Sequence, residues 1–147
     1  MPEGAARVIL AFDFGLRRIG IAAGNTISQA AHSLGAAHSG PQGPDWSAIE
    51  RHLKHYQPDL LLVGRPYNVD GSIGTLEAAA SEFASALAAR AGRPVQRVDE
   101  RYSSLEASAQ LKQQRAAGAR GRIERADVDG LAAAILLERY LRGEREG

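Results

Sequence analysis

The 147-residue sequence contains no cysteine, which excludes disulfide bonds, thiolate metal sites and thiol nucleophiles. Its 18 basic and 17 acidic residues give a formal net charge of only +1, so any contact with nucleic acid requires a local basic patch. The longest uninterrupted apolar run, residues 131–137, is far shorter than the roughly 20 residues that span a bilayer. Residues 1–7 lack the apolar core of a signal peptide. We therefore expect a cytoplasmic protein with no membrane partner and no redox chemistry of its own.

The length of the chain suits one α/β domain with a proper core. Residue patterns predict strands over 8–14, 19–23, about 27–37, 60–64 and 95–98, and helices over about 46–56, 75–90, 103–116 and 127–142. Residues 39–44 are expected to form a loop. Crossover helices then imply a five-stranded mixed sheet, in which three antiparallel strands precede parallel ones, flanked by helices.

The first predicted strand carries one acid, Asp13, near the end of an apolar run. Even-numbered residues from 8 to 14 would line one face of this strand, and Ile9, Ala11 and Asp13 would line the other. An ionised carboxylate in a strand covered on both sides costs several kcal/mol unless a cation or hydrogen-bond donors compensate it. Two interpretations remain open: Asp13 is a ligand, or it caps the following turn and is neutralised by Arg17 or Arg18.

Two further acids occupy comparable positions. Glu100 directly follows the last predicted strand, and Asp129 lies in the first turn of an apolar helix. The carboxyl ends of parallel strands meet at one edge of a sheet, so Asp13 and Glu100 can converge there, and Asp129 joins them if its helix docks at that edge. Separately, each acid has a structural alternative: Asp129 as a helix-start acid, and Glu100 as a partner of Arg97 or Arg101.

Together the three acids suggest a divalent cation. Carboxylates without cysteine suit Mg²⁺ or Mn²⁺ rather than zinc. Two such ions, bridged by Asp13 and completed by Glu100 and Asp129, can activate water and stabilise the leaving oxygen in phosphodiester cleavage. Nearby basic residues would bind the substrate backbone, or they form only a solvated loop; they are Lys112, Arg115, Arg120, Arg122 and Arg125.

Four segments carry a family resemblance. They are FDFGLRRIGIA (12–22), VGRPYNVDGS (63–72), VDERYSSLEA (98–107), and Val128-Asp129 before the apolar helix. In this order, and over nearly the whole chain, they resemble the signature blocks of the YqgF family of pre-16S rRNA nucleases, also described as Holliday-junction resolvase-like. The resemblance implies a ribonuclease H-like fold similar to that of the RuvC resolvase.

The resemblance also implies functional residues. Asp13, Glu100 and Asp129 would be the metal-binding catalytic acids. The residues that would approach nucleic acid are Arg17, Arg18, Asn68, Arg101, Arg115, Arg120 and Arg122. Two positions depart from the family pattern: Arg17 stands where lysine is common, and Arg65 where an apolar residue is usual. Arg65 either adds a phosphate contact or is simply exposed.

These observations predict a divalent-metal-dependent endonuclease that processes the 5′ end of precursor 16S rRNA, acts on the pre-30S ribosomal particle, and is a monomer or homodimer. One alternative is a dimeric Holliday junction resolvase that cleaves branched DNA. A second is a non-catalytic, nucleic-acid-binding ribosome factor. A third is a nucleotide-binding protein, because an Asp-x-Gly hairpin also opens the actin and sugar-kinase fold, although that fold needs two such domains.

Overall fold

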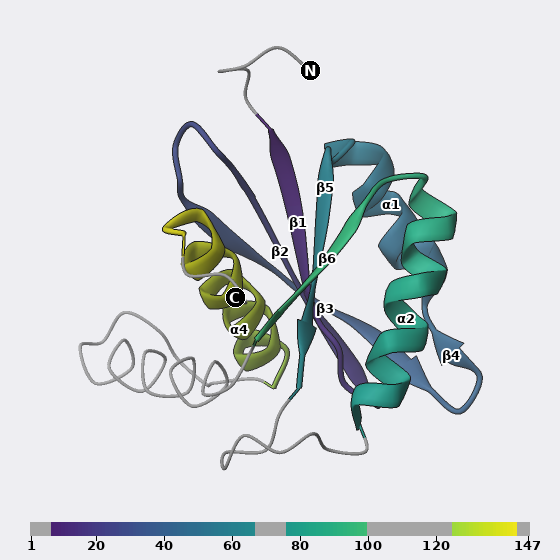
Figure 1. The fold of residues 1–147 in the computed structure, drawn as a ribbon. Coiled ribbons are helices and arrows are strands. Elements are labelled where there is room, and N and C mark those ends of the chain that lie inside the picture. Colours follow the sequence, from purple (N-terminus) through teal and green to yellow (C-terminus); the bar gives the residue numbers. More distant parts are fainter. Residues whose placement is uncertain (1–6, 67–75, 100–124, 144–147) are drawn as a thin grey trace, which may run out of the picture.

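The computed structural model describes residues 7–66, 76–99 and 125–143, which form one six-stranded sheet with helices on both faces (Figure 1). In chain order the elements are β1 (Val8–Asp13), β2 (Arg18–Asn25), β3 (Ala31–Gly40), β4 (Gly43–Pro44), α1 (Trp46–Tyr56), β5 (Leu60–Arg65), α2 (Leu76–Ala91), β6 (Val95–Asp99) and α4 (Arg125–Leu141). The strand order is β4-β3-β2-β1-β5-β6. Because β1 runs antiparallel to β2 and parallel to β5, and β6 runs parallel to β5, the prediction of a mixed sheet is confirmed.

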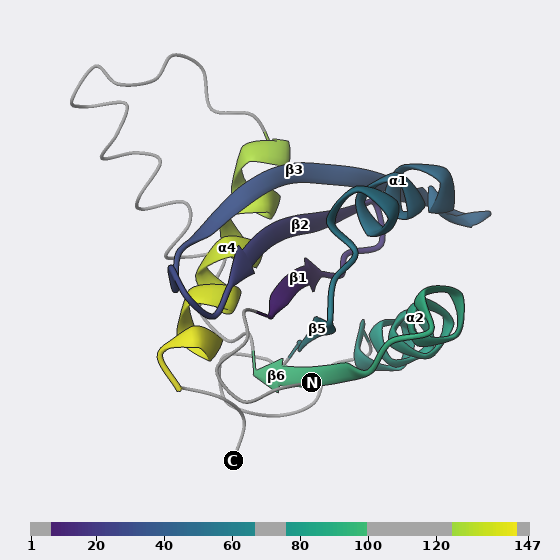
Figure 2. The ribbon, with the colours of Figure 1, turned by 90° about the horizontal axis from the view of Figure 1, so that it is seen from above.

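One face of the sheet is covered by α1 and α2 (Figure 2). Leu10 and Phe12 of β1 and Val63 of β5 share a buried cluster with Ile49 of α1 and Phe83 of α2. The rings of Phe12 and Phe83 meet edge to face, with centroids 5.8 Å apart, a favourable arrangement of aromatic quadrupoles. The even-numbered side chains of β1 therefore line this face, as their alternation predicts.

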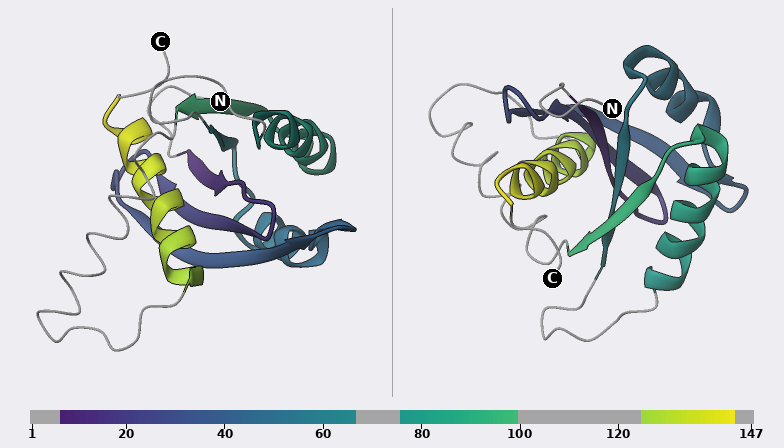
Figure 3. Two further views of the ribbon diagram at one scale, coloured as in Figure 1. Left: turned by 90° about the horizontal axis from the view of Figure 1, so that it is seen from below. Right: turned by 45° about the horizontal axis from the view of Figure 1, so that its top comes forward.

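The opposite face is covered by α4 (Figure 3). Ile9 and Ala11 of β1 form a second buried cluster with Leu136 and Leu137 of α4. Ala22 of β2 packs against the same helix, one turn nearer its start. The prediction that the apolar helix packs on the sheet is confirmed, and β1 is buried on both sides because helices cover both of its faces.

Residues 39–44 contain a short strand, so the predictions of a loop there and of five strands are wrong. Ser39 pairs with Pro44, and Gly40 with Gly43, which adds β4 to the edge of the sheet. Gly43 has a φ of +98°, a conformation that glycine adopts without steric cost and that allows β3 to fold back within two residues.

The third strand begins at Ala31, later than the predicted start near residue 27. The side-chain oxygen of Asn25 accepts hydrogen bonds from the backbone N–H groups of Ile27 at 3.0 Å and Ser28 at 2.9 Å. These bonds close a turn, which holds residues 26–28 away from the strand ladder. The helix predicted over 103–116 lies outside the described residues. None of the helices in the described part of the chain is long and apolar enough to cross a membrane.

Candidate active site

Asp13 is the last residue of β1 and stands opposite Gly20 of β2 in the antiparallel register. Strand alternation places it on the same face as Ile9 and Ala11, the face that α4 covers. Its side chain is half-buried at the end of the sheet from which the β5–α2 connection also leaves. Asp13 therefore lies at the carboxyl edge of the parallel strands, on the α4 side.

Gly20 joins this edge to the first turns of α4. A Cβ atom built on Gly20 would lie 2.0 Å from the backbone oxygen of Asp129, far inside van der Waals contact. The next residue, Gly130, would place its own Cβ 2.0 Å from the Ser33 Oγ of β3. The helix backbone can approach the sheet this closely only because both residues lack a side chain. Gly20 is thus the strand partner of Asp13 and also the residue on which Asp129 rests, so the two acids are brought to one place.

Asp129 is paired with Arg18, the first residue of β2. The Arg18 Nε donates a hydrogen bond to Oδ2 of Asp129 at 2.5 Å, although the two residues are 111 positions apart in the sequence. The exposed fractions of the two side chains are 32% and 22%, so water reaches the pair. The sequence allows Arg18 as a neutraliser of Asp13, and the structure places its guanidinium against Asp129. Arg17 is exposed in the preceding turn.

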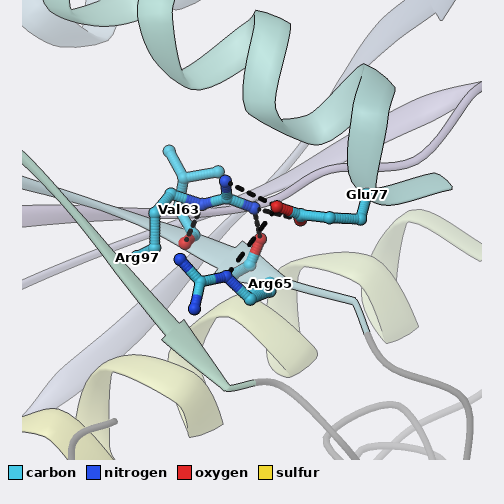
Figure 4. A network of polar contacts seen from close by, with 5 residues as sticks. Val63, Arg65, Glu77 and Arg97 are labelled. Carbon is cyan, nitrogen blue, oxygen red and sulfur yellow. Dashed lines mark hydrogen bonds and ion pairs between the residues drawn. The ribbon is translucent and has the colours of Figure 1, made fainter. Parts of the chain in front are cut away.

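A second arginine cluster lies on the other face of the sheet (Figure 4). Arg97 of β6 contacts both carboxylate oxygens of Glu77 in α2, at 2.6 and 3.2 Å, and donates to the carbonyl oxygens of Val63 at 3.2 Å and Gly64 at 3.0 Å. Arg65 adds a longer ion pair with Glu77 at 3.8 Å. The side chain of Arg65 is 31% exposed. This departure from the family pattern thus has a carboxylate partner within the fold, Glu77, and is also open to water.

The Arg97 cluster ties together the two ends of the β5–α2 connection. Val63 and Gly64 lie near the end of β5, and Glu77 lies in the first turn of α2, so a single guanidinium binds the elements on both sides of the segment that contains Asn68. The Arg97 guanidinium binds Glu77 and backbone, whereas Glu100, the other partner that the sequence allows for Arg97, lies outside the described residues. The sequence gives no local sign of this role, because Glu77 resembles any acid in the first turn of a helix.

Six predicted site residues lie outside the described part of the chain: Glu100, Asn68, Arg101, Arg115, Arg120 and Arg122. Over residues 7–66, 76–99 and 125–143, no three acidic or histidine side chains come together as a metal cluster. Asp13 and Asp129 are the two described members of the predicted triad. As oxygen donors at one edge of the sheet, they fit a hard divalent ion in kind, since Mg²⁺ is bound through one or two carboxylates together with substrate and water.

Gly20 and Gly130 position the site and were not identified from the sequence. The available signal was an isolated glycine within a strand pattern, Ile19-Gly20-Ile21, which is typical of a close backbone approach. What approaches the glycine could not be read from the same pattern, because Gly130 and Asp129 come from the far end of the chain.

The chain is similar to known proteins over almost its whole length. A family model described as "RuvX: Holliday junction resolvase" matches residues 7–143. A protein of Chromohalobacter salexigens named "Putative pre-16S rRNA nuclease" is 41% identical over 140 residues, covering 95% of this chain and 93% of the relative. A protein of the same name from Edwardsiella ictaluri is 41% identical over 138 residues, covering 94% and 96%.

Solved structures share the fold at low sequence identity. Thermus thermophilus RuvC in complex with a Holliday junction substrate superposes with a TM-score of 0.54 at 18% identity, covering 95% of this chain and 98% of the other. The yeast mitochondrial Holliday junction resolvase gives a TM-score of 0.53 at 9% identity, covering 92% and 78%. The predicted ribonuclease H-like fold, similar to that of RuvC, is confirmed by this likeness.

Proposed function

This chain belongs to the RuvX family, and from that premise we propose that it is a divalent-metal-dependent endonuclease that processes the 5′ end of pre-16S rRNA. Family membership and the names of the relatives confirm the predictions of an enzyme and of a nuclease, which hydrolyses phosphodiester bonds. Relatives about 40% identical over nearly their full length carry the pre-16S rRNA name, which supports RNA as the substrate.

The observation that carries this proposal is the meeting of Asp13 and Asp129 at Gly20. We assign Asp13, Asp129 and Glu100 as the residues that hold Mg²⁺ or Mn²⁺. Bound there, such an ion would supply Lewis-acid chemistry, activating water and stabilising the leaving oxygen in phosphodiester cleavage. The close packing of α4 on β2 supports this assignment, because it fixes the backbone of Asp129 beside Gly20, the register partner of Asp13.

Two of the residues proposed to hold the nucleic acid, Arg17 and Arg18, lie a few residues after Asp13. Arg17 and Arg18 follow Asp13 in the β1–β2 turn and at the start of β2, where their charges can meet the phosphate groups. The proposal also includes Asn68, Arg101, Arg115, Arg120 and Arg122. We expect the protein to act in the cytoplasm, on the pre-30S particle, as a monomer or homodimer.

The test is Mn²⁺-dependent cleavage of precursor 16S rRNA by the wild type and by the variants Asp13→Asn, Glu100→Gln and Asp129→Asn. Glu82→Gln is a matched control, because Glu82 is an exposed acid on α2, on the other face of the sheet. We expect all three site variants to lose cleavage and the control to retain it. Full activity in the three site variants would remove the proposed site.

A second candidate function is the resolution of Holliday junctions in DNA. The description of the matching family model and the likeness to RuvC favour it. A resolvase acts on a two-fold symmetric substrate and therefore needs a dimer. Cleavage of a four-way DNA junction, measured beside the rRNA assay, and the mass of the protein in solution separate the two functions. If neither substrate is cleaved although the protein binds RNA, the protein is a non-catalytic ribosome factor.

A further inference from the structure

Arg18 and Asp129 form an ion pair at the proposed metal site. The bond joins one nitrogen, Nε, to one carboxylate oxygen, Oδ2, at 2.5 Å. Both side chains are partly open to water, with exposed fractions of 32% and 22%. An arginine held in this way can move off its carboxylate and be hydrated, because leaving costs it no buried hydrogen bond.

A divalent ion and a guanidinium compete for the same carboxylate. Each favours a negatively charged Asp129, and the two cations repel one another across the few ångströms of the site. Arg18 therefore opposes metal binding for as long as it stays on Asp129. A phosphate group is the other natural partner of an arginine, since it accepts hydrogen bonds from the same planar fork of donors.

We propose that Arg18 is an exchangeable counter-ion: it occupies Asp129 in the free protein, leaves that carboxylate when a divalent ion binds, and passes to a phosphate of the nucleic acid. This inference rests on the proposed function, because it takes Asp129 as a metal ligand. Its consequence is thermodynamic linkage. Nucleic acid that draws Arg18 away raises the affinity for the metal, and bound metal raises the affinity for nucleic acid by the same factor.

The first experiment measures Mn²⁺ binding to the protein without nucleic acid, by electron paramagnetic resonance of free Mn²⁺. Arg18→Gln removes the competing charge, and we expect it to tighten Mn²⁺ binding by about tenfold, within the usual range of coupling between sites. Arg18→Lys keeps a positive charge and should stay close to the wild type. Arg17→Gln is the matched control, because it removes the same charge one residue earlier, from an exposed position, and should change Mn²⁺ affinity little.

The second experiment repeats the titration with a short RNA whose phosphodiesters are replaced by bridging methylene phosphonates, which keep the negative charge but cannot be hydrolysed at the P–C bond. We expect the RNA to tighten Mn²⁺ binding to the wild type several-fold, as expected for linked sites, and to have a smaller effect on Arg18→Gln. Thermal unfolding of each variant establishes that the comparison is made between folded proteins.

The outcomes separate this inference from the function on which it rests. If the wild type binds Mn²⁺ and Asp13→Asn does not, the metal site stands; unchanged or weaker Mn²⁺ binding by Arg18→Gln then overturns the exchange and makes Arg18 an orienting partner of Asp129. If neither the wild type nor any variant binds Mn²⁺, the proposed function fails and the exchange fails with it.

Discussion

Among the arginine-paired carboxylates in the described part of the chain, Glu77 and Asp129 lie on opposite faces of the same sheet, and they are held very differently. Glu77 receives two contacts from Arg97, whose guanidinium also binds two backbone carbonyls, and the side chains of this pair are only 15% and 18% exposed. Asp129 receives one contact from Arg18 in a more open pair. The first arrangement fixes the ends of secondary-structure elements, whereas the second leaves a carboxylate accessible to another cation.

The comparison sets a structural acid, Glu77, against Asp129, the acid proposed to hold a metal ion. A carboxylate and arginine that are largely buried must satisfy nearly all of their hydrogen-bonding groups within the protein, because water cannot replace a missing partner. A carboxylate at a site must be held in place by backbone and still be able to change partner. Gly20 supplies that placement for Asp129 without using its side chain.

The largest effect should come from replacing the functional acid. Asp129→Asn removes the charge of a proposed metal ligand, and we expect cleavage of precursor rRNA to fall by about 1000-fold, consistent with several kcal/mol of charge stabilisation at the reacting phosphate. The free energy of unfolding should change by less than about 1 kcal/mol, because the pair with Arg18 is solvated. Single-turnover cleavage and urea unfolding measure the two quantities. A variant that is inactive because it is unfolded would break the comparison.

The structural acid should show the opposite pattern. Glu77→Gln leaves Arg97 without its counter-charge among half-buried groups, and we expect the free energy of unfolding to fall by about 3 kcal/mol while the folded protein remains active. Glu50→Gln is the matched control. Glu50 pairs with Arg90 at 2.5 Å, but the two side chains are 51% and 44% exposed, so its replacement should cost less than about 0.5 kcal/mol. Equal losses in urea unfolding would contradict the distinction.

The contact between Gly20 and the backbone of Asp129 offers a test of whether the packing of α4 positions this acid. Gly20→Ala puts a methyl group into the backbone of Asp129, and we expect a loss of about 2 kcal/mol in unfolding free energy together with lowered activity. Gly40→Ala is the control, because its Cβ would meet only the end of the His38 side chain at 3.4 Å. A Gly20→Ala protein with normal stability and activity would show that the contact does not position the acid.

The smallest effect concerns His52, a histidine whose protonated form is less favourable in the folded protein than in the unfolded chain. Burial lowers the pKa of His52 below its usual 6.5, and the nearby charges of Arg51 and His55 lower it further. The unfolded chain therefore binds a proton more readily than the folded one. Neutral His52 therefore makes its full contribution to stability above pH 6.5. That contribution is lost as the pH falls from 6.5 through the pKa of His52 in the folded state. Melting temperatures on both sides of pH 6.5 should converge in His52→Gln; an unchanged pH dependence would contradict this origin.

Much of the fold follows from local pattern. The alternation over residues 8–14 predicts which side chains of β1 lie on each face, and the two buried clusters confirm it. The continuous apolar run over residues 60–64 predicts the buried parallel strand β5, and the pairing of β5 with β1 confirms it. The sixth strand, β4, could not be predicted from periodicity because it is only two residues long. Its pairing with the end of β3 depends on the turn at Gly43.

The site was predictable in outline and not in detail. The position of Asp13 at a strand end and of Asp129 at the start of an apolar helix predicts that they approach one edge of the sheet only if that helix docks there. Which arginine faces which acid depends on how α4 docks on β2. That docking depends on two glycines far apart in the sequence, and no local pattern links them. Pairs such as Arg18 with Asp129, or Arg97 with Glu77, therefore become visible only in three dimensions.

The late position of α4 in the chain has a consequence for biosynthesis. A ribosome completes all six strands before it makes the helix that brings Asp129 onto Gly20. Until then the growing polypeptide carries Asp13 and Glu100 without Asp129, and the surface that α4 later covers stays open. If Asp129 is a metal ligand as proposed, the metal site is therefore complete only when synthesis of the chain is nearly finished.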